Sequence, residues 1–222
     1  MAVPRTATRG TLATVSAVVL TGGASQRMGS DKAHLEFDGK PVAERIVRLL
    51  AGLVIDVLIV GGSPPDAALA AGARLVADVE GPQCSLRGLV SALVAARSES
   101  LLVVATDLPF VTPDLLLALV AWPEADAVVP RDANGRHALC ALYRREPVLA
   151  AARERLERGE LALGGLLDAI DTAYLEGEAL ERLDPEGVAL TNVNTPDQLA
   201  AARERHSRRL PMPGGPAWFR PR

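Results

Sequence analysis

The chain has 222 residues, of which 49% are apolar and only 3% aromatic, so a single α/β domain with a core of small aliphatic side chains is expected. The 24 basic and 27 acidic side chains give a formal net charge of −3, which argues against a broad nucleic-acid-binding face. No apolar run approaches the roughly 18–20 residues that a membrane-spanning helix needs, so no membrane span is expected.

The first half of the chain alternates short apolar runs with helical patterns. Residues 15–20 form a β-branched apolar run, which is typical of a buried strand in a parallel sheet. Pro41 suits the first position of a helix, and apolar side chains recur at helical spacing over residues 42–53. The pattern then predicts strands at 55–60, 74–77 and 101–105, and helices at 66–71 and 86–96.

The second half carries two strong helix-start signals. Thr112-Pro113-Asp114 combines an N-cap residue, a proline and a first-turn acid, which predicts a helix at 115–121. Thr195-Pro196-Asp197 repeats this signal before a helix at 198–206. Between these helices, the pattern predicts strands at 127–129, 138–143 and 188–191, and helices at 148–157 and 161–170.

Strands that alternate with helices predict an α/β fold with a doubly wound, mostly parallel sheet and right-handed crossovers. We divide the chain into a flexible N-terminal tail (1–14), one domain (15–206) and a disordered C-terminal tail rich in proline, glycine and arginine (207–222). Ligands of such sheets bind outside the carboxyl ends of the strands. Candidate site residues are therefore sought just after strands, and residues within helices are set aside.

The loop after the first strand, LTGGASQRMGSDK (residues 20–32), combines flexible glycines with cations. Glycines such as Gly22 and Gly23 tolerate positive φ and let backbone N–H groups approach an anion. Arg27 supplies a forked donor for phosphate, and Lys32 supplies a mobile point charge. The spacing matches neither the dinucleotide-binding G-x-G-x-x-G pattern nor the P-loop. A phosphate site is favoured over the alternative, a glycine turn followed by solvated charges.

Asp107 directly follows the strand predicted at 101–105. A carboxylate there suits Mg²⁺, a hard ion that binds oxygen ligands and is often shared with phosphates. A role in capping the turn before Pro109 is supported about as well by the local sequence. The magnesium role gains weight because Asp107 is expected to lie beside the glycine-rich loop.

Two more predicted strands are followed by polar residues. Asp78 follows the strand at 74–77, and Asn192 and Asn194 follow the strand at 188–191. If residues 192–194 are extended, both asparagine side chains lie on one face, which suits a contact to substrate or metal. A turn or a helix cap is the alternative role for each of these residues.

Histidines and cysteines predict no metal site. The three histidines are too scattered in sequence to form a ligand set. Cys84 and Cys140 match no paired metal-ligand spacing and are expected to be reduced thiols of a cytoplasmic protein.

The loop at residues 20–32 resembles the signature loop of nucleotidyltransferases of the molybdenum cofactor guanylyltransferase type. This loop defines the wider superfamily, whereas the Arg-Met-Gly-x-Asp-Lys form and an Asn-Val-Asn-Thr-Pro ending are typical of this branch. The resemblance covers residues 15 to about 205 and implies a Rossmann-like nucleotidyltransferase fold. It continues through Gly39-Lys40-Pro41, Thr106-Asp107-Leu108-Pro109, HALCALY (137–143) and Thr191-Asn192-Val193-Asn194-Thr195-Pro196.

The resemblance implies an enzyme that joins GMP, taken from GTP, to the terminal phosphate of molybdopterin and releases pyrophosphate, with Mg²⁺ as cofactor. Asp107 would hold the Mg²⁺, and Asn192 and Asn194 would lie near the cofactor phosphate or the metal. The implied partners are GTP and molybdopterin, with transient contacts to cofactor-synthesis or acceptor proteins, and neither nucleic acid nor membrane. The nucleotide-binding residues that the resemblance implies are Leu20, Thr21, Gly22, Gly23, Lys32, Gly61, Asp78 and Asp107.

The sequence departs from the family pattern at two places that help to select the base. Gly61 stands after the second strand, where the family usually has asparagine. The usual Gly-Pro-Leu-x-Gly after the third strand appears as GPQCSLRG (residues 81–88). The preference for guanine over cytosine is therefore less firmly implied than nucleotidyl transfer itself.

The expected chemistry is an in-line attack by a substrate phosphate oxygen on the α-phosphorus of the nucleotide, and this nucleophile is already ionised near pH 7. Lys32 would neutralise charge near the α-phosphate, and Arg27 with loop amides would hold the leaving pyrophosphate, so these two residues and Asp107 are the candidate catalytic residues. One alternative is transfer of CMP to the same cofactor, or of a nucleotidyl group to another phosphorylated small molecule. An alternative outside enzymes is a nucleotide-binding regulator.

Overall fold

The computed structural model describes residues 12–21, 36–37, 39–62, 64–122, 124–193 and 195–207. The predicted site residues Gly22, Gly23, Arg27, Lys32 and Asn194 lie outside this part of the chain. Most of the two predicted terminal tails also lies outside it. Residues 12–14 form a turn in which Leu12 is buried.

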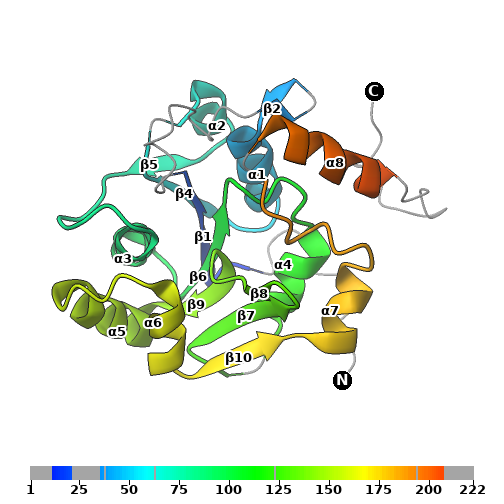
Figure 1. Ribbon diagram of the computed structural model, residues 1–222. Helices are drawn as coiled ribbons and strands as arrows, with labels where there is room; N and C mark the ends of the chain where they lie inside the picture. The colour runs from blue at the N-terminus through cyan, green and yellow to red at the C-terminus, as the bar shows by residue number, and fades with distance from the viewer. Residues whose placement is uncertain are drawn as a thin grey trace.

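A mostly parallel sheet forms the centre of the domain (Figure 1), as the strand–helix alternation predicts. Its strand order is β10-β7-β9-β6-β1-β4-β5. Pairs β6–β1, β1–β4, β4–β5 and β10–β7 are parallel, whereas β9 runs antiparallel to both of its neighbours. The strands of this path are β1 (Val15–Leu20), β4 (Asp56–Val60), β5 (Arg74–Val76), β6 (Ser100–Ala105), β7 (Ala127–Asp132), β9 (Cys140–Arg144) and β10 (Thr172–Leu175).

Three very short strands complete the described β-structure. β8 (Gly135–Arg136) folds back on the end of β7, and β2 (Glu36–Phe37) pairs with β3 (Lys40–Pro41) in a separate two-stranded sheet. β3 leads directly into α1, the helix that Pro41 was predicted to start.

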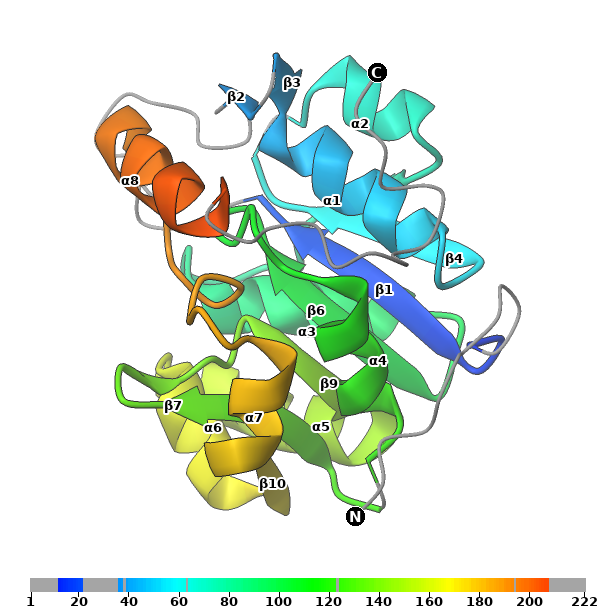
Figure 2. The same cartoon turned by 90° about the vertical axis from the view of Figure 1, so that its right-hand side faces the viewer.

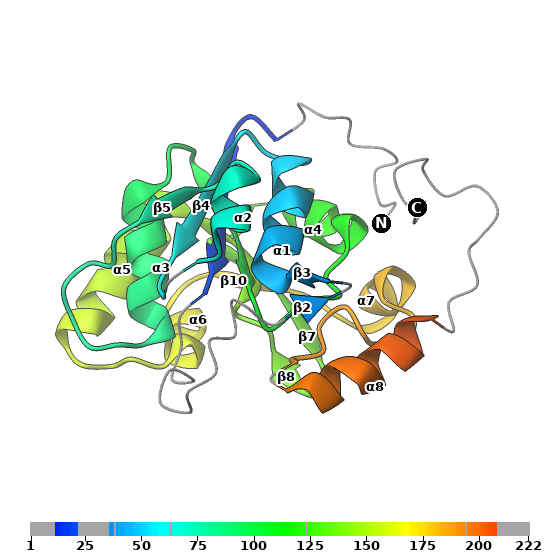
Figure 3. The ribbon, with the colours of Figure 1, turned by 90° about the horizontal axis from the view of Figure 1, so that it is seen from above.

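Helices cover both faces of the sheet, as Figures 2 and 3 show. Side chains alternate across each strand, so that neighbouring residues such as Val18 and Val19 belong to different hydrophobic cores. One core is closed by α1 (Val42–Ala51), α2 (Asp66–Ala70), α4 (Pro113–Val120), α7 (Gly177–Leu183) and α8 (Pro196–Ser207). The other is closed by α3 (Ser85–Ala95), α5 (Arg145–Glu157) and α6 (Leu163–Ala169).

The strands at the centre of the sheet end at the same level. Leu20, the last residue of β1, is paired with Val60 at the end of β4 and with Ala105 at the end of β6. The loops that follow β1, β4 and β6 therefore emerge side by side at one edge of the sheet.

One predicted strand is wrong. Residues 188–191 lie in a turn, in which Thr191 N donates to Val188 O at 3.1 Å. The carboxylate of Asp184 accepts hydrogen bonds from the backbone N–H groups of Val188 and Ala189, at 3.0 and 2.9 Å. These local bonds take up the donors that a strand would offer to a neighbour. The sequence pattern also did not predict β10 or α7.

Among the described residues, no helix combines the length and the apolar character needed to cross a bilayer.

Candidate active site

The order of the strands marks a crevice at the carboxyl edge of the sheet. From β1 the chain continues outward to β4 and β5 on one side, and then returns to β6 on the other side. The strands that follow β1 and β6 in the chain therefore lie on opposite sides, which is the arrangement that opens a ligand crevice in α/β sheets. Thr21 follows β1, and Thr106 with Asp107 follows β6, so the structure places three polar residues at this point.

Backbone hydrogen bonds hold the two sides of the crevice together. Thr106 N donates to Leu20 O at 3.1 Å, and Thr21 N donates to Val60 O at 3.0 Å. The hydroxyl of Thr21 also donates to the carbonyl oxygens of Val60 and Gly61. Both threonines are buried, and their hydrogen bonds hold the ends of β1, β4 and β6 together at the base of the crevice.

The structure brings Asp107 and the asparagine segment together. Val193 N donates to Asp107 O at 2.8 Å, which brings the exposed Asn192 beside the end of β6. This contact forms although residues 188–191 are not a strand. Asn194, the second predicted residue of the segment, lies outside the described residues.

Asp107 also faces the start of β9. Cys140 is fully buried, and its burial together with the negative charge of Asp107 raises the pKa of the thiol to about 12. Both cysteines are free thiols, as predicted.

A pocket opens on the β4 and β5 side of the crevice. Gly61 and Gly62, at the end of β4, adopt positive φ angles of 84° and 57°, a conformation that favours glycine. The pocket therefore has a backbone wall on this side. Its lining residues are Leu20, Val60, Gly61, Gly62, Asp78, Gln83, Cys84, Ser85, Arg87 and Gly88.

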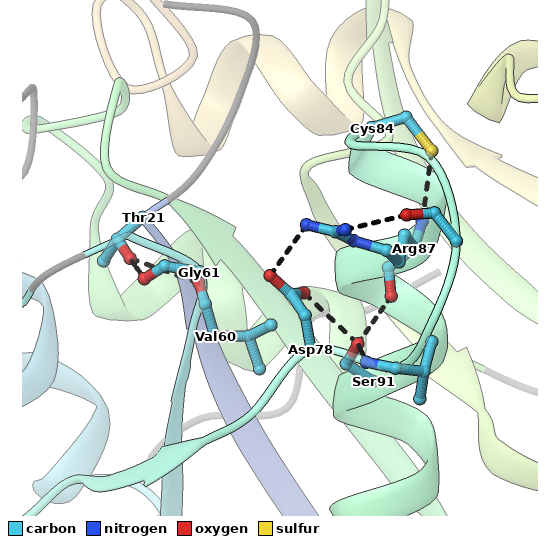
Figure 4. Close-up of polar contacts among 9 residues, drawn as sticks. Thr21, Val60, Gly61, Asp78, Cys84, Arg87 and Ser91 are labelled. Carbon is cyan, nitrogen blue, oxygen red and sulfur yellow. Dashed lines mark hydrogen bonds and ion pairs between the residues drawn. The ribbon is translucent and has the colours of Figure 1, made fainter. Parts of the chain in front are cut away.

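Asp78 lies in this pocket and is engaged by two side chains from α3 (Figure 4). Arg87 NH2 lies 3.0 Å from Asp78 Oδ2, and the hydroxyl of Ser91 lies 3.3 Å from Oδ1. Arg87 NH1 also donates to Gly81 O at 2.9 Å, and Val79 N donates to Ser91 Oγ at 2.9 Å. This network fixes both Asp78 and the start of α3, where Cys84 Sγ accepts from Arg87 N.

Most of the described candidate residues lie at this edge, as predicted, but Arg87 was not predicted to lie there. Asp78, Asp107 and Asn192 were predicted because they follow predicted strands, whereas Leu20, Thr21 and Gly61 were implied by the resemblance. Arg87 lies in the first turn of α3, and residues within helices had been set aside. The available signal was the departure from the family pattern at residues 81–88, which includes Arg87.

Metal-binding groups are sparse among the described residues. No group of three or more histidine, cysteine, aspartate or glutamate side chains is arranged to hold a metal ion in that part of the chain. His137, the histidine at the start of the HALCALY segment, pairs instead with Asp132 at 2.9 Å. Among the described residues, Asp107 and Asn192 carry oxygen ligands near the β6 end of the crevice.

A family model described as a MobA-like NTP transferase domain matches residues 17–173. A probable molybdenum cofactor guanylyltransferase of Chloroflexus aggregans is 35% identical over 195 residues, which are 83% of this chain and 91% of the relative. A probable molybdenum cofactor guanylyltransferase of Pelotomaculum thermopropionicum is 33% identical over 187 residues, which are 84% and 90% of the two chains.

Solved structures show the same fold. Molybdopterin-guanine dinucleotide biosynthesis protein A from Archaeoglobus fulgidus superposes with a TM-score of 0.72 at 25% identity, over 87% of this chain and 99% of that chain. The 2-C-methyl-D-erythritol 4-phosphate cytidylyltransferase from Thermus thermophilus superposes with a TM-score of 0.61 at 20% identity, over 86% and 98% of the two chains. The second likeness bears on the fold alone, which is that of Rossmann-like nucleotidyltransferases.

Proposed function

The chain belongs to the MobA-like NTP transferase family, and on that premise we propose that it transfers GMP from GTP to molybdopterin and releases pyrophosphate. One observation of the structure supports this most directly: Asp107 lies at the crevice between β1 and β6, bonded through its backbone to the Asn192–Val193 segment. A nucleotide and a phosphorylated acceptor need to meet at such a point. The relatives named molybdenum cofactor guanylyltransferase support the choice of both substrates.

In this proposal the chain's own residues position charges rather than move protons. The attacking oxygen belongs to a phosphate that is ionised near pH 7, so catalysis rests on alignment and on stabilising charge. The backbone after β1, at Leu20 and Thr21, would hold the nucleotide, with Gly22 and Gly23 continuing this contact. Lys32 would neutralise charge at the α-phosphate, and Arg27 would hold the leaving pyrophosphate.

Mg²⁺ is part of the same proposal. Asp107 would hold the ion, with the amide oxygen of Asn192 or Asn194 nearby, and bound Mg²⁺ would neutralise negative charge on the phosphate oxygens. A single carboxylate is enough for this mode, because Mg²⁺ at nucleotide sites is usually held by one or two carboxylates together with phosphates. The hard oxygen donors at the end of β6 fit that requirement.

The reaction is assigned to the cytoplasm in this proposal. Two free cysteines in a chain of this size are typical of a reducing compartment. Transient contacts with proteins that supply or accept the cofactor belong to the same proposal.

Release of pyrophosphate, measured with each of the four NTPs and with and without molybdopterin, tests the proposal. We expect release with GTP and Mg²⁺ only when molybdopterin is present, and loss of release when Mg²⁺ is chelated. Preference for CTP would favour CMP transfer to the same cofactor. Binding of nucleotide without pyrophosphate release under any condition would favour a nucleotide-binding regulator.

A further inference from the structure

The pocket beside β4 and β5 carries one pair of opposite charges. Among the described lining residues, Asp78 and Arg87 are the only charged side chains. They pair with each other at 3.0 Å, and their side chains are only 27% and 19% exposed, respectively. A hydrogen-bonding pair at the wall of a nucleotide pocket is suited to reading the edge of a base.

We infer that Arg87, held in place by Asp78, reads the base of the bound nucleotide and selects guanine through its O6 and N7 acceptors. The inference rests on the proposed function and specifies which side chain reads the base of GTP. It makes Arg87 a specificity-determining residue and Asp78 a positioning residue.

The hydrogen-bonding capacity of Asp78 supports this division of roles. Oδ2 accepts from Arg87, and Oδ1 lies 3.3 Å from the hydroxyl of Ser91. The Ser91 hydroxyl is shared with Arg87 O, which lies closer at 2.8 Å, so the ion pair with Arg87 is the main contact that holds the carboxylate. Its neighbours fix its orientation, and it in turn fixes the guanidinium of Arg87.

Arg87 keeps donors for a ligand after these contacts. A guanidinium has five N–H donors, of which one on NH2 is used by Asp78 and one on NH1 by Gly81 O. The Nε atom is buried and thus out of reach of a ligand. One hydrogen on each terminal nitrogen is left, and two such hydrogens can serve two neighbouring acceptors.

The opposite wall leaves room for a base. Gly61 and Gly62 bring backbone and no side chain to the end of β4. Figure 4 shows the Arg87 side chain reaching from α3 to Asp78 on the side of the helix that faces Gly61. Gly61 stands where the resemblance implies an asparagine, so in this chain the side-chain donors come from α3 rather than from the end of β4.

A guanidinium fork distinguishes the bases by their acceptors. Guanine presents O6 and N7 as two adjacent acceptors, and a bidentate arginine is their commonest partner. Adenine presents an amino group beside N7, and cytosine presents an amino group at N4. Each of these amino groups is a donor and would face the N–H donors of the arginine. The geometry therefore favours guanine at this pocket.

The sharpest probe is 7-deaza-GTP, which lacks the N7 acceptor and is otherwise close to GTP. Calorimetry of the whole chain with Mg²⁺ compares the Kd of GTP with that of 7-deaza-GTP. We expect the wild type to bind GTP tighter by about fivefold or more, because a bidentate arginine–guanine pair gives about 1–3 kcal/mol of discrimination. The ratio should fall to about one in Arg87→Met, which keeps the length of the side chain without its donors.

Three further variants sharpen the result. Arg87→Lys keeps the charge next to Asp78 but loses the fork, so the ratio should also fall; this variant decides the matter if Arg87→Met does not fold. Arg97→Met, an exposed arginine just beyond the other end of α3, should keep the wild-type ratio. Asp78→Asn should lower the ratio, because it releases the guanidinium without removing it.

A ratio near one in the wild type, or an unchanged ratio in Arg87→Lys and Arg87→Met, would overturn the role of Arg87. If Asp78→Asn leaves the ratio unchanged but weakens GTP relative to inosine triphosphate, Asp78 reads the base itself and its positioning role is wrong. These failures are separable from failure of the proposed function. In the latter case, the wild type would release no pyrophosphate with GTP and molybdopterin, whatever its preference among guanine analogues.

Discussion

At the scale of the residue, Asp107 and Lys32 are the two side chains from which the proposed chemistry is most easily tested. Asp107→Asn removes the charge that would hold Mg²⁺, and Lys32→Ala removes the cation expected at the α-phosphate. Electrostatic contacts of this kind are worth about 2.7–4 kcal/mol each in the transition state, so turnover should fall by about a hundredfold or more. Steady-state pyrophosphate release measures the loss, and circular dichroism verifies that the fold is kept.

Asp114 provides a matched control for the acidic variant. It is exposed in the first turn of α4, a short way along the chain from Asp107 and outside the crevice. Asp114→Asn should leave turnover near the wild-type value. Near-normal turnover in Asp107→Asn would instead show that the carboxylate does not hold the metal.

The two cysteines differ in a way that reports on the pocket. Cys84 lines the pocket at the start of α3 and is half-buried, whereas Cys140 is fully buried beside Asp107, with its pKa raised to about 12. Only a thiolate reacts readily with alkylating reagents. At pH 8 we expect iodoacetamide to label Cys84 in the folded protein and Cys140 only after unfolding, as mass spectrometry of peptides would show.

GTP gives this experiment its functional control. Because Cys84 lies in the proposed base pocket, saturating GTP should slow its labelling several-fold, while ATP at the same concentration should have little effect. Equal labelling of Cys84 with and without GTP would place the base elsewhere.

The location of a candidate residue in the fold could be predicted where a simple rule connects sequence to position. Asp107, Asp78 and Thr21 each follow a strand, and parallel strands deliver such residues to one edge. Arg87 obeys no such rule, because it reaches the pocket from the first turn of a helix that starts at the same edge. Its role depends on the distance to Asp78, which the sequence does not contain.

At the scale of the element, a polar cluster ties four elements together at the edge opposite the crevice. Asp56, at the start of β4, is only 7% exposed; it accepts from Ser16 of β1 at 2.8 Å and from Arg74 Nε of β5 at 2.8 Å. Arg74 NH2 also donates to the carbonyl oxygen of Ala95 at the end of α3, at 2.6 Å. The cluster therefore fixes the lateral order of the strands that carry Thr21 and Gly61.

Stability should depend on the ionisation of Asp56. Burial alone would raise the pKa of this carboxyl, but hydrogen bonds from Arg74 and Ser16 outweigh it and hold the pKa below its usual value. The unfolded chain therefore binds the proton more tightly than the folded one. The stabilisation is full above pH of about 4, near the unfolded pKa, and is lost as the pH falls through the lower folded pKa.

Asp56→Asn tests this dependence. At pH 7 the variant should be less stable by about 1–3 kcal/mol, because Arg74 loses a charged acceptor. The difference from the wild type, measured by urea unfolding at a series of pH values, should shrink below pH of about 4. A difference that stays constant down to pH 3 would mean that shape, rather than charge, is what Asp56 contributes.

The elements were predicted best where local pattern and packing agree. The apolar run at 15–20 becomes β1 with the expected bounds, and Thr112 caps α4 by accepting from Leu115 N. The apolar run at 188–191 is buried as a strand would be, but Asp184 binds its backbone donors, so burial alone misled the prediction. The direction of β9 is set by its short connection from β7, since a parallel pair needs a crossover.

At the scale of the whole molecule, the C-terminal helix returns to cover the first part of the chain. The guanidinium groups of Arg45 in α1 and Arg203 in α8 both stack on the ring of Phe37, at 4.8 and 4.6 Å from its centroid. The ring of Phe110, in the loop after β6, meets Phe37 edge-on at 5.2 Å. This contact joins segments from both ends of the domain close to Asp107.

Two truncations test what this closure contributes. Removal of residues 208–222 should leave thermal stability and turnover unchanged, because the sequence predicts disorder for this Pro-, Gly- and Arg-rich tail. Removal of residues 196–222 also deletes α8, with buried Leu199 and Ala202 and the cation over Phe37. That loss should amount to about 2–4 kcal/mol and lower Tm by roughly 5–15 °C.

Turnover of the chain without α8, measured well below its lowered Tm, shows whether α8 only stabilises the fold or also positions the Asn192–Val193 segment. The Asn192–Val193 segment is retained in the shorter chain, so its bond to Asp107 can still form. If α8 only adds stability, turnover at low temperature should stay near the wild-type value. If α8 also holds the segment against Asp107, turnover should fall at every temperature. The decrease in kcat/KM should then be larger for molybdopterin than for GTP, because Asn192 lies on the acceptor side of the proposed site.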